Sequence, residues 1–153
     1  VAMVCLGATS VKTLTFPKAG FSIDPLDFSP GTASTQALMM FLPQSGGFGP
    51  NVNVQIQPFA GTMDQYVDLS KSQFMSMKLT QVSESRPTPD SAIFEYEGKF
   101  QGRDLHWYAR AQMKGGLVYL ATATATRSQW PTVSAHMKAC VDSLKLHGSP
   151  GGK

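Results

Sequence analysis

The chain has 153 residues, a net charge of +3 and a hydrophobic content of 42%, which is enough for one domain with a substantial core. Its Lys and Arg residues are scattered and form no run of like charge, which argues against a nucleic-acid-binding surface. No apolar stretch approaches the roughly 18 residues of a transmembrane helix, so none is expected.

Residues 1–11 are an uncharged N-terminal segment with a short apolar run, and they permit two interpretations. The first is the remnant of an export signal, with small residues near Ala8 resembling a cleavage site. The second is a short strand. Together with the low charged content of 15% and the many Ser and Thr residues, this start favours a periplasmic or secreted protein, with a cytoplasmic location as the alternative.

The first strands are predicted from apolar residues between turn signals. Residues 14–16 and 21–23 form two short strands around the turn at 17–20, and residues 37–42 form an apolar run that predicts a buried strand. A flexible glycine loop follows, with Phe48 as its exposed side chain. Residues 51–57 then alternate between apolar and polar, as in a half-buried strand.

A helix is expected from Thr62 to about Lys78. Thr62 is a good N-cap, and Gln65 three residues later completes a capping box. Helical spacing places one apolar face toward a core, formed by Met63, Tyr66, Val67, Phe74 and Met77. The prolines of residues 87–89 then mark a loop.

Three strands and a second helix complete the pattern. Residues 93–100 and 105–113 alternate around a hairpin tip at 101–102, and residues 117–125 are apolar on both faces, as in a central covered strand. An amphipathic helix follows at about 130–145. The sequence therefore predicts a single α+β domain over residues 12–146, with a mostly antiparallel sheet sandwiched between helices, and a flexible tail at 147–153.

This order of elements resembles the PsbP/Mog1 superfamily, which includes bacterial DUF1795 and DcrB-like proteins. The resemblance covers residues 14–146. It rests on the segments Ala19-Gly-Phe-Ser-Ile23, Val52-Asn-Val-Gln-Ile56, Asp64-Gln-Tyr66, Phe100-Gln-Gly-Arg-Asp-Leu105 and Val141-Asp-Ser-Leu144. The resemblance implies the same sandwich fold and a mostly non-enzymatic accessory role.

No complete catalytic, cofactor or metal motif accompanies this fold. The chain has no Gly-x-Ser-x-Gly elbow, no phosphate loop and no closely paired cysteines, so we expect no enzyme activity, no cofactor and no metal site. Its two cysteines, Cys5 and Cys140, lie at opposite ends of the chain. They form either a disulfide in an oxidising compartment or two separate buried thiols.

The predicted partner-binding residues lie on the polar face of the hairpin. His106, Tyr108 and Arg110 follow one another on one strand face, and Glu95 and Glu97 lie beside them on the adjacent strand. Aromatic and Arg side chains are favoured at binding hot spots, and the loop residue Phe48 is added on the same ground. The alternative is that a helix covers this face and packs the row beneath it.

Two functions remain open on the sequence. The first is a non-catalytic accessory protein of the cell envelope that binds a protein or peptide partner. The second is a small-molecule or lipid-binding protein with a pocket between helix and sheet, lined by residues such as Phe74, Met75 and Trp107. An exposed apolar patch would favour the first, and an enclosed cavity with few polar groups would favour the second.

Overall fold

A computed structural model of the chain describes residues 14–17, 20–23 and 35–147. The chain divides into two units, Val1–Thr32 and Ala33–Lys153. The expected export signal or strand in residues 1–11 lies outside the described residues, as do residues 148–153 of the expected tail. The domain bounds of 12 and 146 stay predictions.

The described part of the first unit is a small antiparallel hairpin. Strand β1 (Leu14–Phe16) pairs with β2 (Phe21–Ile23), with Leu14 opposite Ile23. The N–H of Gly20 donates to the carbonyl of Pro17 at 3.3 Å and closes the turn between them. Both strands and the turn were predicted from the sequence, and they are confirmed.

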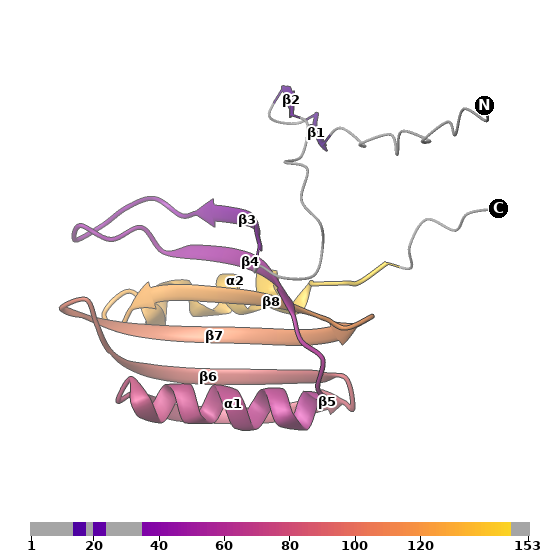
Figure 1. The fold of residues 1–153 in the computed structure, drawn as a ribbon. Helices are drawn as coiled ribbons and strands as arrows, with labels where there is room; N and C mark the ends of the chain where they lie inside the picture. Colours follow the sequence, from indigo (N-terminus) through magenta and orange to yellow (C-terminus); the bar gives the residue numbers. More distant parts are fainter. Residues whose placement is uncertain (1–13, 18–19, 24–34, 148–153) are drawn as a thin grey trace, which may run out of the picture. The chain divides into compact units, whose positions relative to one another are not determined.

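The second unit contains a six-stranded sheet with two helices (Figure 1). The sheet order is β3-β4-β8-β7-β6-β5, and every neighbouring pair is antiparallel. The elements are β3 (Thr35–Phe41), β4 (Asn51–Pro58), α1 (Met63–Ser76), β5 (Thr80–Thr88), β6 (Ser91–Phe100), β7 (Arg103–Lys114), β8 (Leu117–Thr126) and α2 (Trp130–Asp142). The predicted α+β class with a mostly antiparallel sheet is confirmed.

Local sequence signals account for the starts of both helices. The hydroxyl of Thr62 accepts from the N–H of Gln65, and the Gln65 amide oxygen accepts from the N–H of Thr62, so the predicted capping box is present. Helix α2 begins without a side-chain cap, and Pro131 lies in its first turn. Proline is tolerated there because its missing N–H would have no partner within the helix.

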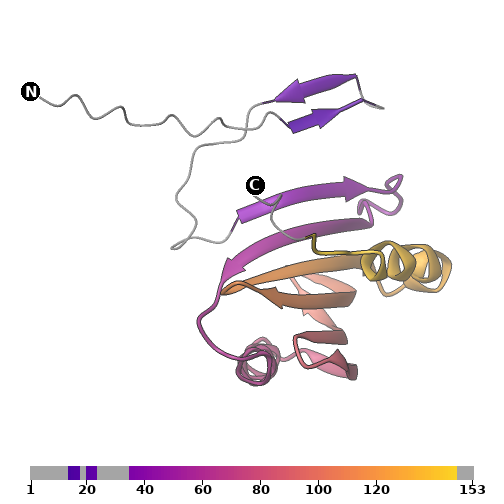
Figure 2. The same ribbon diagram turned by 90° about the vertical axis from the view of Figure 1, so that its right-hand side faces the viewer.

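The two helices pack on opposite faces of the sheet (Figure 2). On one face, α1 residues such as Met63 and Val67 pack with Phe94 and Val118. On the other face, Met137 and Val141 of α2 pack on the small side chains Ala121, Ala123 and Ala125 of β8. Strand β8 is thus covered on both faces near the centre of the sheet, as its sequence predicted.

The two edge strands differ from the sequence prediction. Strand β3 is an end strand of the described sheet, and the side chains of residues 36–41 are exposed, with Phe41 at 65%, so the prediction of a buried strand at 37–42 is wrong. An apolar run cannot show whether a strand has neighbours on both sides. Strand β5 was missed, because its residues are polar and the prolines near its end indicated a loop.

A close approach between β6 and the start of β5 provides a test of this packing. A Cβ on Gly98 would lie 2.7 Å from Leu79 Cδ2 and 3.3 Å from Leu79 Cα. We therefore expect Gly98→Ala to lower the free energy of unfolding by about 1–3 kcal/mol, measured by urea denaturation. Gly49→Ala is the control, since its Cβ would meet ordinary contacts at 3.6 and 3.7 Å. Equal stability of the two variants would contradict this packing.

Candidate binding surfaces

The predicted row on β6 and β7 lies beneath α2. In the sheet, Glu95 is opposite Tyr108 and Glu97 is opposite His106, so the expected neighbourhood of the row is confirmed. However, His106 is 7% exposed and Tyr108 is 9% exposed. Of the two alternatives left open by the sequence, the structure has the one in which a helix, α2, covers this face and packs the row beneath it. Partner binding by the row stays a prediction that nothing in the structure tests.

His106 occupies the centre of a polar cluster between the sheet and α2. Its Nε2 lies 2.8 Å from Glu95 Oε1, and its Nδ1 lies 3.3 Å from Glu97 Oε2. The ring also stacks on Trp130 of α2, with centroids 4.2 Å apart. The imidazole therefore joins two strands to the helix that covers them.

The carboxylates of this cluster also have cationic partners. Lys138 Nζ lies 2.8 Å from Glu95 Oε2, and Arg127 lies 3.2 Å from Glu97 Oε1. Burial acts to raise the pKa of Glu95, but hydrogen bonds from Lys138 and His106 outweigh it, so this pKa lies below its ordinary value of 4.5. Glu95 thus joins α2 to the sheet through Lys138. Glu97 joins β6 to His106 on β7 and to Arg127 in the turn after β8, so both carboxylates have a structural role.

Tyr108 and Arg110 also bond to α2. The Tyr108 hydroxyl donates to Asp142 Oδ1 at 2.9 Å, and Arg110 donates to the Asp142 carbonyl at 2.6 Å. Burial, with a further effect of Asp142, raises the pKa of Tyr108 to about 12, so the hydroxyl stays protonated. The sequence prediction missed Lys138, Trp130 and Asp142. No local pattern in the sequence reports their contacts with the sheet.

Two further residues selected from the sequence are half-buried; Phe48 was expected to be exposed, whereas Cys140 was expected either in a disulfide or as a buried thiol. Phe48 is half-buried against the cluster of Leu79, Leu105 and Trp107, and the Arg103 guanidinium lies 5.8 Å from its ring centre. Cys140 is a free, half-buried thiol in the structure. Its expected partner Cys5 lies outside the described residues, so the disulfide stays a prediction.

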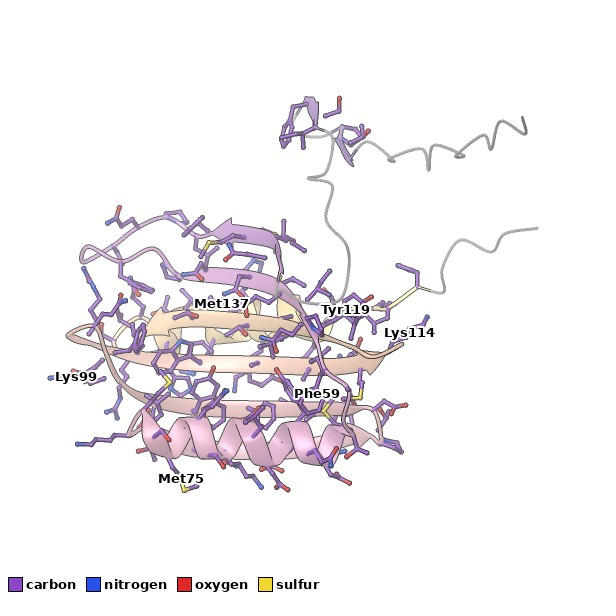
Figure 3. All side chains as sticks on the ribbon, viewed as in Figure 1. Phe59, Met75, Lys99, Lys114, Tyr119 and Met137 are labelled. Atoms are coloured by element: carbon purple, nitrogen blue, oxygen red, sulfur yellow. The ribbon has the colours of Figure 1, made fainter. Side chains whose placement is uncertain are left out.

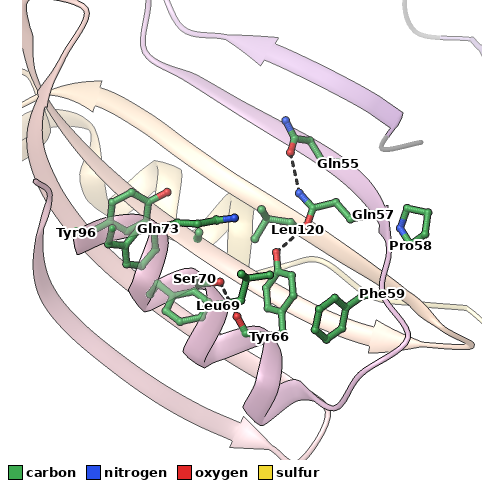
Figure 4. Close-up of a pocket in the computed structure, with 13 residues that line it drawn as sticks. Gln55, Gln57, Pro58, Phe59, Tyr66, Leu69, Ser70, Gln73, Tyr96 and Leu120 are labelled. Atoms are coloured by element: carbon green, nitrogen blue, oxygen red, sulfur yellow. Dashed lines mark hydrogen bonds between the residues drawn. The ribbon is translucent and has the colours of Figure 1, made fainter. Parts of the chain in front are cut away.

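A pocket of about 440 Å³ lies between α1 and the sheet (Figure 4). Helix α1 packs on β5 and β6, so the pocket opens where the same sheet face continues onto β8 and β4. Its lining combines amides with aromatic and aliphatic side chains and contains no charged residue; the main members are Gln55, Gln57, Phe59, Tyr66, Leu69, Gln73, Phe74, Tyr96 and Leu120.

The residues that line the pocket agree only partly with those predicted from the sequence. Phe74 lines it, whereas Trp107 lies on a smaller neighbouring pocket of about 250 Å³ and stacks on Tyr96 at 5.1 Å. Met75 is 70% exposed and points away from the sheet (Figure 3). The amides of Gln55 and Gln57 were not selected, although their alternation placed them on one strand face.

A third surface is the outer edge of β3. Leu38, Met39, Met40 and Phe41 are four consecutive exposed apolar residues on this strand. Beside them, a pocket of about 210 Å³ lies between β3, β4 and α2 and is lined in part by Met40, Val52, Met137 and Cys140. An exposed apolar surface of this kind commonly marks an interaction site.

The fold resembles that of a solved protein of unknown function. PA94 from Pseudomonas aeruginosa matches with a TM-score of 0.69 and 13% sequence identity, over 90% of this chain and 98% of PA94. PsbP (CyanoP) from Synechocystis sp. PCC 6803 matches with a TM-score of 0.49 and 14% identity, over 96% of this chain and 98% of that one. No family model and no curated protein matches the sequence.

These findings define the class of fold. The chain has an α+β fold that it shares with PA94, with a six-stranded antiparallel sheet and one helix on each of its faces. Within the described residues, neither helix has the length and apolar character needed to span a membrane. The same residues contain no group of three side chains placed to hold a metal ion.

The contact between Tyr108 and Asp142 predicts a specific loss of stability. We expect Tyr108→Phe to lower the free energy of unfolding by about 1–2 kcal/mol, because the buried side chain loses its hydrogen bond to a carboxylate. Tyr119→Phe is the control, since no hydrogen bond of the Tyr119 hydroxyl occurs within the described residues. Thermal denaturation of both variants measures the difference. Equal stability would mean that the Tyr108 hydroxyl does not help to hold α2.

The lowered pKa of Glu95 predicts an acid-dependent contribution to stability. A carboxylate with a folded pKa below its unfolded value stabilises the fold above the unfolded pKa and loses this effect as the pH falls through the folded pKa. Glu95→Gln should therefore destabilise the protein by about 1–3 kcal/mol at neutral pH, and by progressively less below pH 4.5. Denaturation curves across this range measure the change.

The loss of stability in Gly98→Ala is steric and does not depend on ionisation. This variant is therefore the control for the pH dependence. If Glu95→Gln lowered the free energy of unfolding by the same amount from neutral pH to below the folded pKa of Glu95, the role given to Lys138 and His106 would be contradicted.

Proposed function

We propose that this chain is a non-catalytic accessory protein that binds an extended segment of a protein partner along the outer edge of β3. The observation that carries the proposal is the exposed apolar sequence of this edge strand, Leu38 to Phe41. Addition of a peptide strand to a sheet edge supplies affinity through backbone hydrogen bonds and specificity through alternate side chains.

The opposite edge of the same sheet provides an internal comparison. Strand β5 contains Glu84, Arg86 and Pro87 and has two register shifts, all of which hinder pairing with another chain. Glu84 pairs with Lys71, and Arg86 pairs with Asp64. Strand β3 has no charged residue and no proline, and only one register shift. The protein thus protects one edge and leaves the other suited to pairing.

The hydrogen-bond pattern identifies which N–H groups of β3 face outward. The N–H of Leu42 donates to the carbonyl of Pro50 at 2.8 Å, toward β4. N–H directions alternate along an antiparallel strand, so those of Met39 and Phe41 point away from β4. No described strand pairs with β3 on that side. These two N–H groups are the donors offered to a partner strand.

We include in the same proposal that the protein is located in the cell envelope. The low charged content of the chain supports it. Fractionation of the source cells into cytoplasmic and envelope fractions, followed by detection of the protein, measures the location directly. Recovery in the cytoplasm alone would contradict this part of the proposal and leave the binding mode untouched.

A proline substitution on β3 tests the binding mode. Met39→Pro removes one outward N–H without removing a bond to β4, and proline is tolerated on edge strands in this orientation. We expect Met39→Pro to abolish capture of a partner from envelope extracts by the immobilised protein. Met39→Ala retains the N–H and should reduce capture only in part.

Met75→Lys is the second control, because Met75 is a well-exposed methionine on α1, away from β3. It should capture the partner as the wild-type chain does. Equal capture by Met39→Pro and the wild type would contradict strand addition. Concentration-dependent dimers that Met39→Pro abolishes, seen in sedimentation, would instead identify a second copy of this chain as the occupant of the edge.

A second candidate function is the binding of a small molecule in the pocket between α1 and the sheet. The specific observation in its favour is the pocket volume of about 440 Å³, which lies within the usual range of about 300–1,000 Å³ for small-molecule sites. This function uses other residues than the β3 edge, so the two can be tested separately.

A further inference from the structure

We propose that the pocket between α1 and the sheet binds a small neutral saccharide. This inference rests on the second candidate function and names the ligand class. The lining contains amides, hydroxyls and aromatic rings but no charged side chain. A charged ligand would lose its hydration there without gaining an opposite charge, which is unfavourable, so the pocket favours an uncharged one.

One end of the pocket presents a chain of polar groups. The Tyr66 hydroxyl donates to Gln57 Oε1 at 2.8 Å, and Gln57 Nε2 donates to Gln55 Oε1 at 3.2 Å. Burial raises the pKa of Tyr66 to about 12, so its hydroxyl remains a donor. This chain leaves the amide nitrogen of Gln55 and one N–H of Gln57 free to donate to a ligand.

The other end of the pocket is formed by Gln73 and Tyr96 (Figure 4). Neither the Gln73 amide nor the Tyr96 hydroxyl hydrogen-bonds to another residue within the described part of the chain. Burial raises the pKa of Tyr96, which therefore also stays protonated. Polar groups at both ends match a ligand with hydroxyl groups around its rim, since each sugar hydroxyl both donates and accepts, as an amide side chain does.

Apolar side chains separate these two ends. Phe74 stacks on Tyr96 with ring centres 4.2 Å apart, and Leu120 contributes an aliphatic side chain from β8. Such a surface suits the C–H face of a sugar ring. A fatty acyl chain fits less well, because it would leave the amides of Gln55, Gln57 and Gln73 without partners, which is costly when they are desolvated.

Titration of the full chain with two neutral disaccharides, maltose and N,N′-diacetylchitobiose, tests the inference. We expect saturable shifts of the side-chain amide signals of Gln55, Gln57 and Gln73 in NMR spectra with at least one of them. Gln73→Ala should weaken this binding by about three- to tenfold, the effect of one lost hydrogen bond. Alanine is a strong helix former, so this exposed position on α1 should stay folded.

Gln81→Ala removes an exposed amide that does not line the pocket, so this variant should bind the disaccharides as the wild type does. Met39→Pro should also bind them as the wild type does. Absence of saturable binding for both disaccharides, or equal binding by Gln73→Ala and the wild type, would overturn the inference. Saturable binding of laurate without disaccharide binding would overturn it too, while leaving the second candidate function in place. None of these outcomes depends on partner capture at β3.

Discussion

The main constraint on this structure is that a sheet of six strands needs cover on both faces, while the described chain supplies one helix to each. Helix α1 packs on β5 and β6, and α2 packs on the opposite face around β8. Each helix is too narrow to cover its whole face. The pocket beside α1 lies on the part of its face that the helix leaves uncovered, and it is therefore a consequence of the fold.

The sequence predicted the covered part of the fold well because burial leaves periodic patterns. The capping box at Thr62, the alternation on β6 and β7, and the apolar character of β8 all report contacts with neighbouring elements. The edges were predicted poorly for the same reason. The apolar residues of β3 resemble those of a buried strand, and the polar residues of β5 resemble a loop, although both strands pair on only one side.

The candidate site shows a similar limit. Alternation correctly placed His106 and Tyr108 on one face beside Glu95 and Glu97, because neighbours in a hairpin are determined by local register. Whether that face is covered depends on α2, which follows later in the chain and contributes Lys138 and Asp142. No local pattern reports such a contact. A polar row in a sequence can therefore be an open surface or a buried cluster with all its charges paired.

The strand β4 connects both sides of the sheet. Val52 and Val54 pack toward α2, while Gln55 and Gln57 lie in the pocket beside α1. Because successive side chains of a strand point to opposite faces, a shift of one residue in the pairing of β4 would move the amides into the core and the valines into the pocket. Burial of Val52 thus holds the register that presents the amides. The packing that stabilises the fold and the polar groups available to a ligand are determined by the same eight-residue strand.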